Sequence, residues 1–514
     1  MRGRRQRLAL VGCGLLAALT SACGSTVQGA STLSPGAVAA PGSAAAGAGG
    51  DGLGVPTPAA GGSTAGTPGY TAGATTGGAG SAGAVTGPAG AGGGGSTRDG
   101  SGAGVTPTVS APGITATKVY VGLAYSSDAA AANRAIGAAG AAASYDGRDV
   151  YNAVIRYANT HGGFLGRKLE PIYFNLSVAK DQNAQTQSAC ETWTQDHKVF
   201  ALEALRNDIL RSCAEKAGAI SMVGGDGVKS TFDRFPHFVD PNAIRLDRLG
   251  NVTVGGLSKA SYFAGKLGLI TWDDNNYRFA MQHGYLPALA SHGVKPSIEP
   301  VYISVPQQLD GLGDMTAAVS SAVTKFRAAG INHVIIQDGP AGVWAGGGLT
   351  LEWMNQAKSQ HYYPRYGQNA YNLPGNSELP ADQMDKALAI MESDDDARYD
   401  AGWHRNQARE KCYEIQAAAG LPVKSSNSED EAFASQACDQ IFFLQQVINS
   451  LTTVISSDAF MRIVEGLGTS FRSAVVYGTR FGPGRHDGAD QVRTAEYFQS
   501  CTCLKYSGPP YYPD

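Results

Sequence analysis

Residues 118–124 read Lys-Val-Tyr-Val-Gly-Leu-Ala, and residues 149–159 read Asp-Val-Tyr-Asn-Ala-Val-Ile-Arg-Tyr-Ala-Asn. The first stretch is an apolar run rich in β-branched and aromatic residues, which is typical of a buried strand. The second places five apolar side chains on one face of a helix: Val150, Ala153, Val154, Tyr157 and Ala158. A strand followed by an amphipathic helix is the repeating unit of an α/β fold.

The same alternation continues along the chain in two series. The first has strands at 169–174, 199–202 and 219–223 and helices at 181–196 and 209–218. The second has strands at 267–271, 300–305, 333–337 and 365–369, with helices through 285–289, 315–329 and 349–359. Further helices are predicted at 382–393, 403–419 and 429–455, followed by a strand pair at 473–477 and 497–506. We therefore expect an α/β protein with two Rossmann-like lobes, each with a parallel sheet, joined by a hinge.

The N-terminus has the form of a signal for export. An arginine-rich start precedes the apolar run 8–19, and Leu19-Thr-Ser-Ala-Cys23 resembles the bacterial lipobox, with Thr20 where that motif prefers leucine. The resemblance implies a signal peptide at 1–22 and lipidation of Cys23. The alternative is ordinary cleavage near Ala22, which would leave Cys23 as an unpaired thiol.

Residues 23–112 are dominated by Gly, Ala, Ser, Thr and Pro and contain one aromatic residue, Tyr70. Such a segment buries too little apolar surface to fold, so we expect a disordered linker that spans on the order of 50 Å. The net charge is −3, and loss of residues 1–22 removes four arginines and no acid, which leaves −7. An acidic mature protein is a poor nucleic-acid binder, so no nucleic-acid partner is expected.

Six cysteines lie in the part expected to fold: Cys190, Cys213, Cys412, Cys438, Cys501 and Cys503. An even set in an exported protein favours disulfides, and six cysteines allow fifteen pairings. We expect nearest neighbours to pair. No Cys/His set has zinc-ligand spacing, so no metal is expected.

Ligands of open parallel sheets bind at the carboxyl ends of the strands, so the loops after the predicted strands are candidates for a ligand site. Tyr125, Ser126 and Ser127 offer hydroxyls and amides. Arg206, beside Asn207, can bind a carboxylate or phosphate, or belong to a surface salt bridge. Gly225 and Asp226 lie in a glycine-rich loop, and the remaining candidates follow later strands: Trp272, Asp273, Tyr277 and Asp338.

Three of these candidates carry specific expectations. Trp272 and Tyr277 can enclose a ligand or pack in the core. Asp273, with Asp274, favours a positively charged ligand or caps a helix.

The sequence contains no pattern that predicts an enzyme. Residues 224–230, Gly-Gly-Asp-Gly-Val-Lys-Ser, lack the glycine frame of a phosphate-binding loop. No Gly-x-Ser-x-Gly elbow and no His-x-x-x-His pair on a predicted helix is present. We therefore expect no catalytic residue, no cofactor and no enzymatic activity.

Three stretches resemble the type I periplasmic binding proteins, in particular the branched-chain amino-acid and amide-type substrate-binding lipoproteins of ABC transporters. Residues 113–122, Gly-Ile-Thr-Ala-Thr-Lys-Val-Tyr-Val-Gly, resemble the family's entry strand. Residues 159–168, Asn-Thr-His-Gly-Gly-Phe-Leu-Gly-Arg-Lys, resemble its N-x-x-G-G-x-x-G-R-K turn, and 271–277, Thr-Trp-Asp-Asp-Asn-Asn-Tyr, the opening of its second lobe.

The resemblance implies discontinuous lobes, here 113–262 with 378–472 and 263–377 with 473–506, joined by three crossing segments. It implies a monomer that is anchored by lipid to the outer face of the cytoplasmic membrane. Its function would be to capture a small polar ligand, amino-acid-like or an amide, for ABC permease subunits. A ligand-sensing lipoprotein without transport, or an enzyme that uses the same cleft, is the alternative. Asp338 lies near the position of the family's ammonium-binding acid.

Overall fold

The structure is a computed structural model, and it describes residues 108–131, 143–203, 208–344, 346–374, 378–393, 406–424 and 428–513. The chain divides into two units, residues 1–97 and 98–514, and all described residues belong to the second. The predicted signal peptide, Cys23 and nearly all of the predicted linker therefore lie outside the described residues. Within the described ranges, no helix combines the length and the apolar composition needed to cross a membrane.

A five-stranded parallel sheet forms from the first half of the described chain, with strand order β3-β2-β4-β5-β6. Strand β2 pairs with β3 along its whole length, from Lys118 opposite Lys168 to Tyr125 opposite Asn175. The elements are β2 (Lys118–Tyr125), α2 (Gly147–Thr160), β3 (Lys168–Asn175), α3 (Gln182–Glu191), the π-helix η1 (Thr192–Asp196), β4 (Ala201–Glu203), α4 (Asp208–Ala217), β5 (Ile220–Met222), α5 (Lys229–Arg234) and β6 (Phe238–Val239).

A seven-stranded sheet follows, with strand order β14-β13-β11-β10-β9-β7-β8. Its first five strands in the chain are parallel, and β13 and β14 are antiparallel to their neighbours. The elements are α6 (Leu246–Lys259), β7 (Leu267–Asp273), α7 (Asn275–Ala280), η2 (Met281–Tyr285), α8 (Leu286–Ser291), β8 (Val301–Ser304), η3 (Leu309–Gly311), α9 (Leu312–Ala328), β9 (His333–Gln337), α10 (Gly348–Ser359), β10 (Arg365–Asn369), η4 (Ala370–Asn372), α11 (Ala381–Met384), β11 (Leu388–Met391), β13 (Val492–Phe498) and β14 (Cys503–Tyr511).

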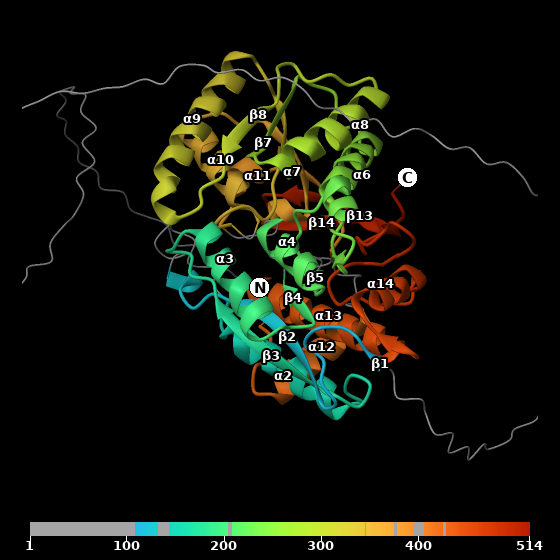
Figure 1. Cartoon of the computed structure of the whole chain (residues 1–514). Coiled ribbons are helices and arrows are strands. Elements are labelled where there is room, and N and C mark those ends of the chain that lie inside the picture. Colours follow the sequence, from blue (N-terminus) through green and yellow to red (C-terminus); the bar gives the residue numbers. More distant parts are fainter. Residues whose placement is uncertain are drawn as a thin grey trace, which may run out of the picture. The chain divides into compact units, whose positions relative to one another are not determined.

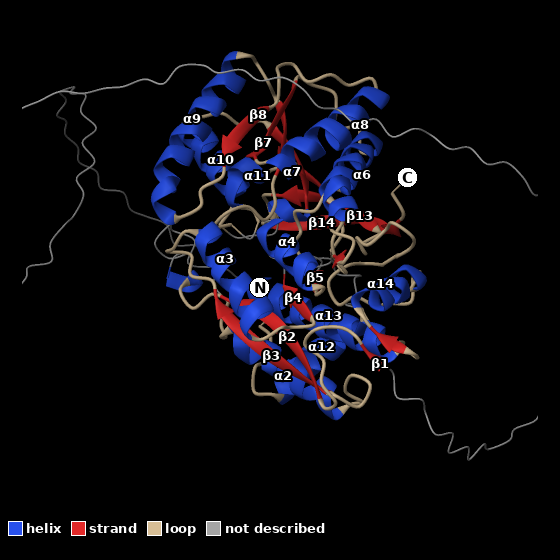
Figure 2. Cartoon of the chain, viewed as in Figure 1, coloured by secondary structure: helices blue, strands red, loops and turns tan. Residues whose placement is uncertain are grey.

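Both sheets repeat one connectivity. Within each, the first five strands along the chain stand in the spatial order 2-1-3-4-5, and helices connect them (Figure 2). In this arrangement the strand order reverses between the first and the third strand, β2 and β4 in one sheet and β7 and β9 in the other. A doubly wound sheet holds its ligands at the carboxyl ends of the strands near that reversal.

Three late helices return to the first sheet: α12 (Gln407–Ala418), α13 (Ser428–Asn449) and α14 (Ser457–Gly466). In Figure 1, α12 and α13 lie in orange beside α2, and α14 lies near β1. Buried residues of α13, among them Ile441, Leu444 and Ile448, share a core with Val121 of β2 and Val154 of α2. A short pair, β1 (Thr108–Val109) with β12 (Val454–Ile455), is parallel.

Two segments that connect the sheets run side by side. Asp240 in the first faces Asp487 in the second in a parallel bridge. Asp439 on α13 binds both segments, because its carboxylate accepts hydrogen bonds from Asn242 and from Ser473. The connection between β11 and α12 includes 394–405, which lie outside the described residues.

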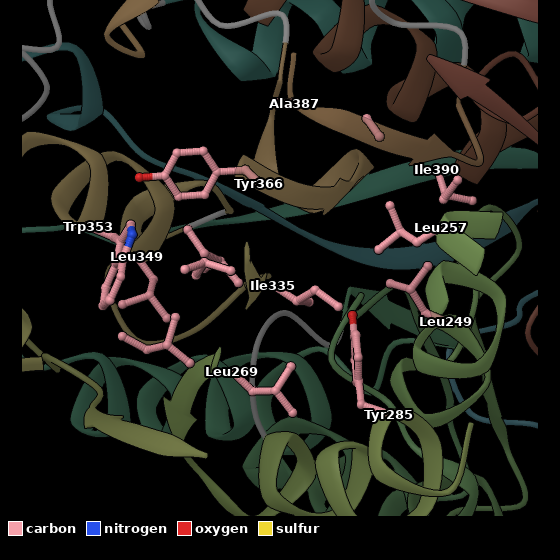
Figure 3. Close-up of a cluster of buried hydrophobic side chains, with 14 of the residues drawn as sticks. Leu249, Leu257, Leu269, Tyr285, Ile335, Leu349, Trp353, Tyr366, Ala387 and Ile390 are labelled. Atoms are coloured by element: carbon pink, nitrogen blue, oxygen red, sulfur yellow. The ribbon is translucent and has the colours of Figure 1, made fainter. Parts of the chain in front are cut away.

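The first lobe was predicted to contain 246–262 and 378–393, whereas the structure places α6 and β11 with the seven-stranded sheet. Figure 3 shows the reason: Leu249 and Leu257 of α6 pack toward Ile335 of β9 and Ile390 of β11 in one buried cluster. The fit is close, since a Cβ on Gly256 of α6 would lie 2.4 Å from Cδ1 of Ile390. The second lobe therefore begins at α6.

The helix predicted at 382–393 is wrong, because this segment forms the short helix α11 and then strand β11. Strand β11 lies between β10 and β13 and is buried throughout. A short apolar run that is buried on both faces has no period that separates strand from helix. The strand predicted at 473–477 is also wrong, since the amides of Val475 and Val476 both donate to Oγ of Ser473 in a turn.

The three disulfides join nearest neighbours, as predicted. Cys190 of α3 pairs with Cys213 of α4, Cys412 of α12 with Cys438 of α13, and Cys501 with Cys503 between β13 and β14. Each of the first two connects consecutive helices that cover the first sheet.

Candidate functional site

A pocket of about 180 Å³ opens at the carboxyl ends of strands from both sheets. Leu176, Asp226 and helix α3 contribute from the first lobe, and the loops after β7, β8 and β9 contribute from the second. The lining residues are Leu176, Gln182, Asn183, Thr186, Asp226, Asp274, Tyr277, Val305, Gln307, Pro340, Ala341 and Gly342. This is where a doubly wound pair of sheets is expected to bind a ligand.

Asp226 is held in place by a buried arginine. The side chain of Arg211, from α4, is fully buried and pairs with Asp226 and also with Asp208, at 2.9 Å from Nη1 to Oδ1. Arg234 of α5 pairs with the same Asp208. Burial raises the pKa of Asp226, while the guanidinium of Arg211 opposes that rise. Truncation of Arg211 would leave an uncompensated carboxylate in the wall of the pocket.

Asp240 fixes the glycine-rich loop from behind. One carboxylate oxygen, Oδ2, accepts hydrogen bonds from the backbone amides of Gly224 at 3.1 Å and Gly225 at 2.8 Å. Burial raises the pKa of Asp240 to about 6. These two amides are therefore engaged within the protein, although they lie beside the pocket.

Gly225 is where the first lobe approaches the second most closely in this loop. Its φ is +67°, and a Cβ there would lie 2.9 Å from Oη of Tyr371 and 3.0 Å from Cγ of Pro340. Both partners belong to the second lobe, in η4 and in the loop after β9. Only glycine satisfies both the left-handed backbone and the close approach.

Tyr277 lines the pocket from α7 and is itself 1% exposed. Its hydroxyl donates a hydrogen bond to the carbonyl of Pro340 at 3.0 Å, and burial holds its pKa well above the usual range. Gly339 permits this position, because a Cβ at φ +156° would lie 2.4 Å from the tyrosine oxygen. Tyr277 thus joins α7 to the loop after β9.

Asp274 is the N-cap of α7, and its Oδ1 accepts a hydrogen bond from the amide of Asn276 at 2.9 Å. Capping was one of the two roles predicted for the acidic pair at 273 and 274. Asp273 lies beside the pocket rather than in its lining, and Arg278 pairs with it at 2.5 Å on the surface.

Amide side chains supply much of the remaining polar lining. Gln182 and Asn183 begin α3, and Gln307 follows β8. The amide of Gln182 donates to the carbonyl of Gln307 at 3.2 Å, which joins the two lobes across the pocket. The side-chain amide of Gln182 donates to the carbonyls of Ser177 and Lys180 and so orders the loop before α3.

Trp272 and Asp338 lie in the core of the second lobe instead of in the pocket lining. The indole of Trp272 donates to Oδ1 of Asp338 at 3.1 Å, while the amide and hydroxyl of Thr350 each donate to Oδ2 at 2.8 Å. Burial raises the pKa of Asp338 to about 6 against these donors. These hydrogen bonds connect β7, the residue after β9, and α10. Of the two roles predicted for Trp272, the structure shows packing in the core.

The loop after β2 takes part in local contacts. The ring of Tyr125 packs under the guanidinium of Arg148, at 4.4 Å from its centroid. Ser126 donates to Asp128, and the amide of Ser127 donates to Asn175. These residues are not in the pocket lining, and the predicted Arg206 and Asn207 lie outside the described residues.

Three of the lining residues, Asp226, Asp274 and Tyr277, were predicted from the sequence, whereas the contributions of α3 and of the loop after β8 were not. The strand-end rule could have indicated Val305 and Gln307, since they follow a predicted strand. Nothing in the sequence indicated Gln182 or Asn183, because a helix reaches the pocket only through the tertiary arrangement.

The lining of the pocket combines carboxylate, amide and hydroxyl side chains with apolar ones. It contains no cysteine, serine, lysine or histidine among the described residues. In the same part of the chain, no group of three or more His, Cys, Asp or Glu side chains is arranged to hold a metal ion.

Solved structures with the same fold are substrate-binding proteins. A branched-chain amino acid ABC transporter from Thermus thermophilus with bound valine is 15% identical, with TM-score 0.55, over 77% of this chain and 96% of that one. A substrate-binding protein of an ABC transporter from Aeropyrum pernix is 13% identical, with TM-score 0.55, over 78% and 97%. A solute-binding protein from R. palustris in complex with 4-hydroxybenzoate is 12% identical, with TM-score 0.54, over 77% and 97%.

No protein-family model and no curated protein matches the sequence. The structural likeness nevertheless spans nearly the whole of each neighbour and includes both sheets. The described chain therefore has the α/β fold of the type I periplasmic binding proteins, as the sequence predicted.

Proposed function

We propose that this protein is an extracytoplasmic solute-binding lipoprotein, which captures a small polar molecule between its lobes and presents it to the permease of an ABC transporter. The pocket carries this proposal. It lies at the carboxyl ends of both sheets, and side chains of both lobes line it. A ligand held there would contact both lobes and favour their closed arrangement, which is how a hinged receptor couples binding to recognition by a partner.

The contacts across the pocket support closure by hinge motion. Gly225 of the first lobe meets Pro340 and Tyr371 of the second, and Gln182 donates to Gln307. Contacts of this kind between the rims of two lobes can form when the lobes close and break when they open. The paired segments around Asp240 and Asp487 are the candidate hinge.

The solved neighbours support the same function at the level of fold. Those named above are described as substrate-binding or transporter proteins, with valine or 4-hydroxybenzoate bound in two of them. A fold hosts many functions, so the ligand of this chain has to come from its own pocket.

The first experiment is a ligand screen on the whole chain, purified from membranes in detergent. Amino acids, amides, amines, sugars and aromatic acids are tested for a saturable rise in melting temperature. A ligand at a hundred times its Kd adds about 2.7 kcal/mol to the free energy of unfolding. Recovery of the compound unchanged would support a receptor, and its turnover would favour an enzyme that uses the same pocket.

A matched pair of variants locates the site. Asn183 lines the pocket, whereas Gln187 lies one turn further along the same helix, is exposed and is outside the lining. Asn183→Ala should reduce the ligand-induced shift, and Gln187→Ala should leave it unchanged. Equal effects of the two would contradict binding in this pocket.

The membrane anchor is tested separately. Cys23→Ser removes the thiol that would be acylated, so the variant should lose labelling by radioactive palmitate and move from the membrane to the soluble fraction. Retention at the membrane without label would show that something other than lipid holds the protein there.

Deletion of this chain from the cell distinguishes a role in transport from a role in sensing. Uptake of the identified ligand should fall when the chain is deleted and return with the wild-type copy. Unchanged uptake together with a lost transcriptional response would support the sensing alternative.

A further inference from the structure

The charges around the pocket are predominantly negative. Asp226 and Asp274 line it, and none of the described lining residues is a lysine, arginine or histidine. The other polar groups are uncharged amides and hydroxyls. A charged ligand would therefore meet carboxylates and no cation in this part of the lining.

The nearby arginines are already engaged. Arg211 is fully buried, pairs with Asp226 and Asp208, and lies 4.5 Å from the centroid of the Phe238 ring. Arg234 is bound to Asp208. With Asp240 and Asp274, this group holds four carboxylates and two guanidinium groups, so an excess of negative charge remains.

Three hydrogen-bond donors in or beside the pocket are engaged as well. The amides of Gly224 and Gly225 donate to Asp240, and the hydroxyl of Tyr277 donates to Pro340. An anionic ligand would have to displace an internal carboxylate to reach those amides, and like charges would repel it.

Asp274 is the carboxylate best placed to meet a ligand. It lines the pocket, its hydrogen bond from the amide of Asn276 uses only Oδ1, and no cation pairs with it among the described residues. Its negative charge also contributes to the raised pKa of both Asp226 and Tyr277, which agrees with a short separation between these groups.

We infer that the pocket selects a small organic cation, a primary amine with a short apolar body, and discriminates against carboxylates. The ammonium would bind Asp274 and Asp226, and the apolar body would contact Leu176, Val305 and Pro340. A cavity of about 180 Å³ restricts the ligand to a small molecule. The inference rests on the proposed solute-binding function and specifies its ligand class.

The test uses one carbon skeleton in four charge states: L-leucinamide as the cation, L-leucine as the zwitterion, 4-methylpentanamide as the neutral amide and 4-methylpentanoate as the anion. Calorimetry on the whole chain in detergent at pH 7.0 gives each Kd. L-leucinamide should bind at least tenfold more tightly than 4-methylpentanoate, a difference of about 1.4 kcal/mol.

A matched pair of aspartates assigns the effect to the pocket. Asp274→Asn keeps a good helix cap but removes the charge, so the advantage of L-leucinamide should fall at least fivefold. Asp273→Asn removes the neighbouring charge outside the lining and should leave that advantage within twofold of wild type. Equal effects of the two variants would overturn the assignment.

Different binding results would overturn the charge inference and the proposed solute-binding function. Binding of 4-methylpentanoate as tight as that of L-leucinamide would overturn the charge inference and leave a solute-binding protein. If no probe of any charge binds, and the wider screen finds no ligand either, both the inference and the solute-binding function are overturned.

Discussion

Substitution of Gly225 by alanine tests whether the two lobes close where the structure places them. The residue has φ +67°, and an added Cβ would lie 2.9 Å from Oη of Tyr371 and 3.0 Å from Cγ of Pro340 in the other lobe. Gly218 is a matched control in the same lobe. It also has φ +67°, but a Cβ there would have no neighbour within 4 Å.

The two substitutions share one cost and differ in another. A left-handed backbone costs an alanine roughly 1–2 kcal/mol, so both variants should lose about that much free energy of unfolding. Only Gly225→Ala adds a clash, because carbon atoms normally stay about 3.5–4.0 Å apart. Overpacking of this kind costs about 1–3 kcal/mol, and opening of the lobes would relieve it.

The added cost should therefore appear in ligand affinity. A penalty of about 1–3 kcal/mol on the closed arrangement corresponds to about 5- to 150-fold weaker binding. Calorimetry with the ligand found in the screen measures it, and urea unfolding of both variants measures the shared strain. If Gly225→Ala and Gly218→Ala bind that ligand equally well, contact between the lobes at this loop does not contribute to closure.

Three further substitutions have distinct expected outcomes. Tyr277→Phe removes the hydrogen bond to Pro340 while keeping the buried ring. The free energy of unfolding should fall by about 0.5–1.5 kcal/mol in urea titrations, and ligand affinity should fall with it. If both values are unchanged, this hydrogen bond does not stabilise the pocket. Replacing Cys412 and Cys438 by alanine opens a loop with a sequence separation of 26 and should cost about 3 kcal/mol or more; a change below about 1 kcal/mol would contradict a structural disulfide. Burial raises the pKa of Asp439 to about 6, so the folded state binds a proton between pH 4 and 6 that the unfolded state does not, and this group's contribution to stability decreases as the pH rises through that range. Asp439→Asn should make the dependence of melting temperature on pH between 4 and 6 less steep, while Asp240 and Asp338 keep their share of it. An unchanged slope would refute the assignment.

Sequence patterns predicted the fold well where strands and helices alternate. The strand at 333–337 is found as β9, since a β-rich apolar run between two amphipathic helices has one consistent interpretation. The strand at 365–369 is found as β10, although its sequence, Arg-Tyr-Gly-Gln-Asn, is mostly polar. The prediction failed for β11, which is too short and too uniformly buried to show a period. Helix α6 was missed because Val252, Thr253, Val254 and three glycines obscure its apolar stripe.

The candidate site was predicted less completely. Asp226 and Tyr277 follow strands that end at the pocket, and the strand-end rule found them. Trp272 and Asp338 satisfy the same rule but lie in the core of the second lobe, where the indole of Trp272 donates a hydrogen bond to Asp338. A loop position alone does not say which face a side chain reaches.

The sequence by itself determined two features: the alternation of strands and helices, and the pairing of cysteines that are neighbours in the chain. Those features depend on residues a few positions apart, or on a rule that holds for every doubly wound sheet. The tertiary structure alone decided which lobe receives α6 and β11, and which side chains meet across the pocket. Asp240 accepts hydrogen bonds from the amides of Gly224 and Gly225, and Gly225 lies close to Pro340. Folding brings these segments together from distant parts of the chain. Such contacts depend on packing in three dimensions, so they leave no periodic pattern in the sequence.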